Sequence, residues 1–342
     1  MKPSTPYCIN GVNGIRFNCD NNQEWRAERA HSIGASAVGI LIGDNHWTTP
    51  MELARKMRAE LNGEFDYTQT LAMMRGHAYE QGVADLFSWQ TGHQVIKSSS
   101  AEYIIRRTDI PFMHASPDRT YWIDETGKKI GKNAEYNKGI LECKTTRRPI
   151  DPDDLPMSWV FQLQVQMGIS GYKQGFIAWD VLTNPDGFGY RFFEYDEEVF
   201  MAAVAVCRDF WEKCIVKGED PDPVSAGDIL RKYPRHITGK TVTVSQATQN
   251  LILDIKEMEA TEKELKTEID RMKDKLKAQF TDEEAMVDMD GKVLATYKSS
   301  AGRKSVDSKK LEAEYPDVYN NCLKYSEGSR TLIIKQPTKP KK

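Results

Sequence analysis

The stretch ILECKTTRRP, at residues 140–149, carries two opposite charges directly after an apolar pair. Glu142 and Lys144 are two residues apart, with Cys143 between them. Successive side chains of a β-strand point to opposite faces, so Glu142 and Lys144 would point the same way. A carboxylate and an ammonium would then share one small patch near a strand end. Two interpretations are open at this point: a surface ion pair, or half of a metal site.

The overall composition limits what the chain can bind. Its 342 residues suggest one large domain or two smaller ones. Because 47 Lys and Arg stand against 50 Asp and Glu, the formal net charge is −3. No overall positive field therefore attracts nucleic acid. A polyanion would have to be held by a local basic groove or by metal ions.

The cysteines and the hydropathy pattern indicate an intracellular protein. None of the six cysteines forms a C-x-x-C pair, which argues against a zinc knuckle. Free thiols fit a cytoplasmic location. No apolar run approaches the roughly 20 residues of a membrane span, so no membrane partner is expected.

Helix and strand patterns alternate along the first two-thirds of the chain. Residues 1–22 are polar and are expected to form a loop. The expected helices cover 23–60 (in two pieces), 68–89, 158–170 and 196–216, and the expected strands cover parts of 94–147, 175–183 and 190–195. This order predicts an α/β fold with a central mixed sheet flanked by helices.

The composition changes near residue 217. Residues 1–216 are predicted to form the core, and the Pro- and Asp-rich residues 217–245 a linker. Residues 246–342 are predicted to form a C-terminal extension. It consists of a long helix (about 246–280), a hairpin turning at Asp290-Gly291, a short helix (308–314), a strand (331–335) and a basic tail.

The long helix of the extension carries an apolar seam. Its members repeat at alternating intervals of four and three residues: Leu251, Ile255, Met258, Glu262, Leu265, Ile269, Met272 and Leu276. This is a heptad pattern with one Glu in it. The seam would form a coiled coil between chains or, as is more common for such stripes, pack on its own chain.

A second carboxylate, Asp118, precedes Glu142 by 24 residues. Asp118 follows Pro117 in HASPDRTYW, which reads as a strand. If this strand lies beside the one that carries Glu142, the two carboxylates meet. Carboxylate and carbonyl oxygens with water suit Mg²⁺. Lys144 would then orient a water or stabilise charge on a phosphate oxygen, as metal-assisted phosphodiester hydrolysis requires.

Two helices supply further polar candidates. Glu80 lies in the middle of RGHAYEQGVADLF, and Gln162 and Gln166 share one face of FQLQVQMG. Taken singly, each motif has an ordinary explanation: a chance E-x-K triplet, or a solvated Glu or Gln on a helix surface. The joint order is harder to obtain by chance: Glu on a helix, PD on a strand, E-x-K on the next long strand, and then a Gln-bearing helix.

Four stretches together resemble the lambda-exonuclease or YqaJ-type viral recombinase family of the PD-(D/E)XK nucleases. They are EWRAERAHSIGAS, RGHAYEQGVADLF, HASPDRTYW with ILECKTT, and FQLQVQMGIS, and the resemblance covers about residues 23–216. It implies a restriction-endonuclease-like core.

The resemblance also implies roles for individual residues. Asp118, Glu142 and the backbone carbonyl of Cys143 would bind Mg²⁺, for which Mn²⁺ could substitute. Lys144 would act on the water nucleophile. Glu80 would support the metal site, indirectly or at a second metal, and Gln162 would complete the catalytic set.

A terminal 5′-phosphate would be held by Arg29, Ser36 and Ser116. Arg grips a phosphate through two N–H groups, and Ser donates a hydroxyl. Without the resemblance, Arg29 would be one solvated charge among its charged neighbours. Where the family has a strand-separating apolar wedge, this chain has a different local sequence, LAMMRG, in which Met73 or Met74 would serve as the wedge.

The expected function is a Mg²⁺-dependent 5′→3′ exonuclease that acts on linear double-stranded DNA ends. It would leave a 3′ single strand for phage-type recombination in the cytoplasm of a bacterial host cell. The resemblance implies a single-strand annealing recombinase as partner, and a homo-oligomer, by analogy a trimer. Two alternatives remain: an endonuclease or nickase on the same core, or a non-catalytic DNA-binding assembly protein.

Overall fold

The computed structural model describes residues 4–45, 47–66, 68–97, 103–123, 137–302, 305–325 and 330–334. The chain forms two compact units, Met1–Lys232 and Tyr233–Lys342, which we call the first and the second unit. The predicted basic tail, residues 335–342, lies outside the described residues. None of the helices in the described parts is long and apolar enough to cross a bilayer.

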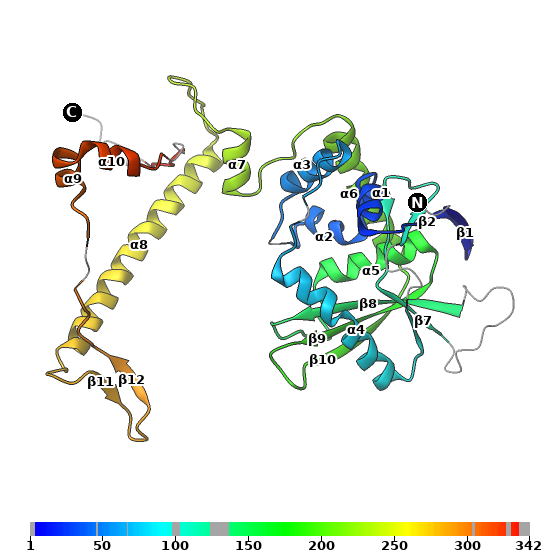
Figure 1. The fold of residues 1–342 in the computed structure, drawn as a ribbon, viewed down its shortest axis with the longest axis horizontal. Helices are drawn as coiled ribbons and strands as arrows, with labels where there is room; N and C mark the ends of the chain where they lie inside the picture. The colour runs from blue at the N-terminus through cyan, green and yellow to red at the C-terminus, as the bar shows by residue number, and fades with distance from the viewer. Residues whose placement is uncertain are drawn as a thin grey trace. The chain divides into compact units, whose positions relative to one another are not determined.

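A five-stranded mixed sheet forms the centre of the first unit (Figure 1). Its order is β10–β9–β8–β7–β4, and only β8 and β9 run parallel. The strands are β4 Val95–Lys97, β7 Arg119–Trp122, β8 Lys138–Thr146, β9 Gln174–Val181 and β10 Phe188–Glu194. The predicted α/β class with a central mixed sheet is confirmed.

Two helices cover opposite faces of this sheet, α4 (Leu71–Thr91) and α5 (Met157–Ser170). On the α5 side, Ile140 of β8 packs with Leu163 in one apolar cluster. On the α4 side, Leu141 packs with Phe87 in another. Because side chains alternate along β8, Glu142 and Lys144 share the α5 face with Ile140.

The residues before the central sheet form smaller sheets and helices. A three-stranded antiparallel sheet has the order β1–β2–β5, and a parallel pair joins β3 to β6. The strands are β1 Thr5–Ile9, β2 Val12–Asn18, β3 Ile33–Gly34, β5 Tyr103–Arg107 and β6 Met113–His114. The helices are α1 Asn22–Ala30, the 3₁₀ turn η1 Ala35–Ala37, α2 Val38–Leu41 and α3 Pro50–Leu61.

The expectation of a loop over residues 1–22 is therefore wrong. The chain forms a hairpin there, and it turns at Asn10 and Gly11, which both have positive φ. The second strand of this hairpin pairs with β5, about ninety residues further along the chain. A strand whose partner is so distant carries little local signal.

The first unit extends beyond the predicted core boundary. After β10 come α6 Glu197–Phe210, a π-helical turn Trp211–Val216 and α7 Ala226–Lys232. Residues predicted as linker are bound to α3. Asp220 accepts hydrogen bonds from Arg55 (2.8 Å) and Arg58, and the buried Asp228 accepts one from the Thr49 hydroxyl (2.9 Å).

The second unit is built around one long helix, α8 (Gln246–Lys277), of which no residue is buried. The predicted hairpin is confirmed as β11 Ala285–Val287 paired with β12 Val293–Thr296. Two short helices follow, α9 Ser308–Glu314 and α10 Pro316–Cys322. Residues 331–334, predicted as part of a strand, have no regular structure.

The ion pairs of Asp220 predict where the chain is cleavable. In Asp220→Ala, Arg55 and Arg58 lose a shared, partly buried carboxylate, which should lower the free energy of unfolding of the first unit by about 1–3 kcal/mol. Limited proteolysis of the full chain should then cut within 217–232, whereas the unaltered chain should be cut first within 233–245. Asp222→Ala, at a fully exposed carboxylate, is the control. Equal cleavage of both variants within 217–232 would contradict this assignment.

Candidate active site

Glu142 is the buried centre of the candidate site. It is 2% exposed, and each of its carboxylate oxygens accepts hydrogen bonds. Oε1 accepts from Lys144 Nζ (2.7 Å) and from the Gln162 amide, and Oε2 accepts from Gln166 Nε2 (2.7 Å). Lys144 Nζ also donates to Gln162 Oε1 (2.8 Å). The alternation along β8 directs Lys144 to the Glu142 carboxylate, and the i, i+4 spacing on α5 directs Gln162 and Gln166 to it.

Asp118 lies directly before β7, on the strand next to Glu142. The antiparallel register pairs Arg119 with Leu141, so Asp118 comes opposite Glu142. Its Oδ2 accepts a hydrogen bond from the backbone N–H of Cys143 (2.9 Å). Burial raises the pKa of Asp118 well above its usual value, and the negative charges of Glu142 and then Glu80 add to the effect. The fold therefore places the Asp118 carboxyl group close to two other carboxylates, and this arrangement disfavours its ionisation.

Glu80 reaches this region through Arg119. The guanidinium of Arg119 pairs with the Glu80 carboxylate and donates to the backbone carbonyl of Asp118 (2.6 Å). Glu80 on α4 thus braces the strand end that carries Asp118. In this arrangement the Glu80 carboxylate is paired with Arg119. This pairing fits the prediction that Glu80 supports the metal site indirectly.

Lys144 is held as an ammonium ion. Burial lowers its pKa, but the charges of Glu142 and Asp118 outweigh burial, so that the net shift of the pKa is upward. Two of its three N–H donors reach Glu142 and Gln162. At neutral pH Lys144 therefore acts as a fixed positive charge and a hydrogen-bond donor.

The donor set fits a hard divalent cation. In a strand the N–H and C=O of one residue point to the same side, so the Cys143 carbonyl is directed toward Asp118, as its N–H is. Two carboxylates and a carbonyl are oxygen ligands of the kind Mg²⁺ prefers. A cation would also relieve the repulsion between Asp118 and Glu142. Within the described ranges no three His, Cys, Asp or Glu side chains form a metal-ligating group, so this donor set has two carboxylates and one backbone carbonyl.

The predicted phosphate ligands come from neighbouring parts of the fold. Gly34 of β3 pairs in parallel with His114 of β6, so Ser36 and Ser116 both lie two residues beyond this pair. A Cβ on Gly34 would come within 3.0 Å of both Arg29 Nη2 and His114 Nε2. The guanidinium and the imidazole thus converge on a glycine that leaves them room.

The polar atoms of this region have unused hydrogen-bonding capacity. The Ser116 hydroxyl and His114 Nε2 are buried and have no hydrogen-bond partner among the described residues. The Arg29 guanidinium stacks 4.4 Å from the centre of the Trp25 ring. Burial lowers the pKa of Arg29 to about 10, which leaves it charged at neutral pH. Ser36 is exposed. An anion is a suitable partner for each of these donors.

The candidate wedge, Met73, lies in the first turn of α4 and is 49% exposed. Its neighbours Leu71 and Met74 are also exposed, so this helix end presents apolar side chains to solvent. Glu80 lies about two turns further along the same helix.

Sequence reasoning missed three members of the site: Arg119, Gln166 and His114. Gln166 was recognised as the helical neighbour of Gln162, but it had no assigned role. Gln166 is 1% exposed, and its Oε1 has no hydrogen-bond partner among the described residues. No sequence motif assigned a role to His114. The signals available were the position of Gln166 on the same helix face as Gln162 and an arginine directly after the PD pair.

Residues 24–173 match the family model of the YqaJ-like viral recombinase domain. These residues therefore resemble that family. The YqaJ-like domain contains every residue of the predicted metal, catalytic and phosphate sets. The uncharacterized protein YqaJ of Bacillus subtilis (strain 168) is 26% identical over 314 residues, which are 89% of this chain and 91% of that protein. Since the first unit has 232 residues, this similarity extends into the second unit.

Solved structures of exonucleases resemble the chain more distantly. Two structures of LHK-Exo, an alkaline exonuclease from Laribacter hongkongensis, one of them in complex with dAMP, are each 17% identical with a TM-score of 0.46. They match 62% and 57% of this chain and 97% and 94% of their own. A phage-related exonuclease from Haemophilus somnus 129PT is 12% identical, with a TM-score of 0.40, over 55% of this chain and 96% of its own.

The electrostatic effect of Glu142 on the buried Asp118 predicts that Asp118→Asn stabilises the metal-free protein. An amide oxygen can still accept the Cys143 N–H, and the repulsion from Glu142 disappears. In EDTA at pH 7.5, the melting temperature of the first transition should rise by at least about 2 °C, the change that about 1 kcal/mol produces in a domain of this size.

Added Mg²⁺ should raise the melting temperature of the unaltered protein and should leave that of Asp118→Asn nearly unchanged. Asp109→Asn, at a carboxylate paired with Arg107 on the surface, is the control and should respond to Mg²⁺ as the unaltered protein does. If Asp118→Asn lowers the melting temperature in EDTA, the two carboxylates do not repel each other.

Proposed function

We propose that this chain is a divalent-metal-dependent deoxyribonuclease that degrades linear double-stranded DNA from its 5′ ends. The observation that carries the proposal is the convergence of Asp118, Glu142 and Lys144 at adjacent strands β7 and β8. The YqaJ-like viral recombinase domain supports a place in DNA recombination. The product would be a 3′ single strand for a single-strand annealing partner.

Asp118, Glu142 and the Cys143 carbonyl would hold Mg²⁺, or Mn²⁺ in its place. The bound ion would supply Lewis-acid polarisation of the scissile phosphate and a water of lowered pKa. The chain's own contribution is a fixed geometry. Gln166 and Gln162 hold Glu142 in one orientation, and Arg119 with Glu80 holds the strand end before β7.

Lys144 would place a positive charge beside the reacting phosphate. Its ammonium is anchored by Glu142 and Gln162, and the remaining N–H can be directed to the attacking water or to a phosphate oxygen. Because the ammonium is already oriented, little reorganisation is needed as charge develops in the transition state. Lys144 therefore serves as an electrostatic and orienting group and does not need to act as a base.

Arg29, Ser36 and Ser116 would bind the terminal 5′-phosphate, with His114 beside them. The buried, unsatisfied Ser116 hydroxyl and the charged guanidinium of Arg29 support this role. A pocket that accepts only a strand end would restrict cleavage to ends. Met73 and its exposed neighbours on α4 would contact the bases that separate.

Removal of the catalytic charges should abolish nuclease activity. Glu142→Gln and Lys144→Ala should each lower kcat on linear duplex DNA by at least about a hundredfold, the usual effect of removing one preorganised catalytic group. EDTA should abolish the activity, and Mg²⁺ or Mn²⁺ should restore it. Lys213→Ala, at an exposed lysine of the first unit, should have no effect.

A covalently closed circular duplex distinguishes the modes of action. It should survive the unaltered protein, because no end is present. Cutting of the circle would indicate an endonuclease or nickase on the same core. Undiminished activity of both Glu142→Gln and Lys144→Ala would remove this site from the catalytic assignment.

The phosphate pocket predicts a preference between DNA ends. On a duplex with a 5′-phosphate at one end and a 5′-hydroxyl at the other, digestion should start at the phosphorylated end at least about tenfold faster, because a charge-assisted contact to Arg29 contributes more than about 1.4 kcal/mol. Arg29→Ala should remove the preference. Arg208→Ala, at an exposed arginine of α6, should retain it. Equal use of both ends by the unaltered protein would contradict the pocket.

A further inference from the structure

The second unit presents a long apolar face that nothing in the described chain buries. The seam of α8 runs from Leu251 to Leu276, a length of about 38 Å at 1.5 Å per residue. Six of its eight members are apolar and between 41% and 72% exposed: Leu251, Met258, Leu265, Ile269, Met272 and Leu276. A 32-residue helix without any buried residue lacks the packing that usually stabilises helices in proteins.

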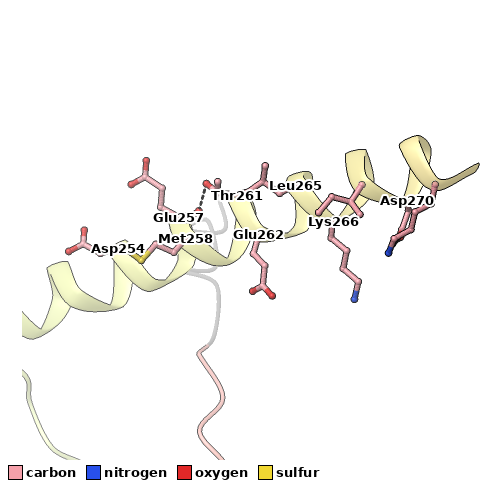
Figure 2. A pocket seen from close by; sticks show the side chains of 10 residues that line it. Asp254, Glu257, Met258, Thr261, Glu262, Leu265, Lys266 and Asp270 are labelled. Carbon is pink, nitrogen blue, oxygen red and sulfur yellow. Dashed lines mark hydrogen bonds and ion pairs between the residues drawn. The ribbon is translucent and has the colours of Figure 1, made fainter. Parts of the chain in front are cut away.

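The charges beside the seam are unevenly distributed along α8. Figure 2 shows two of them, Asp254 in the first half of the helix and Lys266 in the second. With the seam residues at heptad positions a and d, we use "flanking positions" for positions e and g, which border the seam on its two sides. In the first half these positions carry Asp254 and Glu259. In the second half they carry Lys266, Lys273 and Lys275. The one flanking acid of the second half, Glu268, lies 3.3 Å from Arg271 on its own helix.

We propose that α8 forms an antiparallel coiled coil with α8 of a second copy of this chain. With the two-fold axis between Lys263 and Glu264, every seam residue meets another seam residue. The pairs across the interface are Leu251 with Leu276, Ile255 with Met272, Met258 with Ile269, and Glu262 with Leu265. No seam position is left over at either end, so the seam is self-complementary in this direction.

The flanking charges favour the same register and direction. In the antiparallel arrangement Glu259 faces Lys266 of the second copy, and Asp254 faces Lys275. The two-fold axis repeats each pair, so four attractive pairs form. In a parallel arrangement Asp254 would face Glu259 of the second copy instead, and the two copies of Glu262 would share one core layer. The helix dipoles also oppose parallel pairing.

Glu262, the polar residue of the seam, lowers the stability of the coiled coil. A single polar residue at a seam position specifies register and reduces stability. In the antiparallel register each Glu262 meets an apolar side chain and stays separate from its symmetry mate. The dimer is therefore expected to be reversible, and Glu262→Leu should tighten it.

The first test is the mass of the full chain in solution. Sedimentation equilibrium at micromolar concentration and low salt should show an association that Leu265→Asp weakens by at least about a hundredfold, since each dimer loses two buried leucines. Lys263→Glu, on the outer face of α8, should retain it. If Leu265→Asp and Lys263→Glu associate like the unaltered chain, or if the unaltered chain is a monomer, α8 does not pair with itself.

The second test is the direction of pairing. Glu259→Lys should weaken association by about tenfold, because the introduced lysine then faces Lys266 across the interface. The double variant Glu259→Lys/Lys266→Glu should restore it. A parallel coil gives the opposite result for the single variant, since the introduced lysine would then face Asp254. Tighter association of Glu259→Lys would therefore overturn the antiparallel assignment.

A distance measurement provides an independent check on direction. A spin label at Gln249→Cys, with the exposed Cys8 and Cys322 changed to Ser, should report a separation of about 44 Å between copies. The parallel arrangement would bring the two labels close together, within about 20 Å. A short distance that disappears with Leu265→Asp would show parallel pairing.

Discussion

The arrangement of the first unit depends on one buried carboxylate. Burying an unpaired charge costs several kcal/mol, so a Glu that is 2% exposed must be surrounded by donors. For Glu142 these donors are an ammonium and two amides, from Lys144, Gln162 and Gln166. Each of them is itself positioned by the strand or helix that forms the apolar core. The packing of β8 against α5 therefore also fixes the positions of the groups that bind Glu142.

The alternation of β8 separates two tasks within a few residues. Ile140 faces α5 in the core, and Glu142 and Lys144 continue on that same face into the polar site. Leu141 faces α4, and the Cys143 backbone binds Asp118 of the neighbouring strand end. A shift of register by one residue would exchange these faces and place Glu142 among the aromatic residues under α4. The burial of the apolar residues of β8 thereby fixes the register that places Glu142 and Lys144 in the site.

Regular periods explain what could be predicted from the sequence. The pairing of Glu142 with Lys144 follows from the strand period, and the approach of Gln162 follows from a helix next to that strand. The neighbourhood of Asp118 required only that two successive strands pair. The contact of Gln166 with Glu142, in contrast, depends on the depth of α5 against the sheet, which no local pattern encodes.

Long-range pairing explains what was missed. Strand β2 finds its partner about ninety residues away, and β3 pairs with β6 over a similar separation, so neither is visible in a local window. His114 gained its place beside Arg29 only through that second pair. The Asp-rich stretch after residue 217 resembles a linker by composition, but two arginines of α3 bind its Asp220. Composition indicates how well a segment is solvated, and it does not indicate which distant cations bind it.

The two units obey different physical constraints. In the first unit, apolar clusters on both faces of the sheet bury the residues that position the site. In the second, the longest helix has an apolar seam, several ion pairs along its own length and no buried residue. Intrahelical pairs contribute only about 0.2–0.5 kcal/mol each, too little to account for a helix of 32 residues. The similarity to the Bacillus subtilis protein extends into the second unit, whereas the YqaJ-like match ends at residue 173. A helix that keeps its apolar residues in heptad register, with its flanking lysines in one half and its flanking acids, apart from Glu268, in the other, is suited to pair with a second copy of itself.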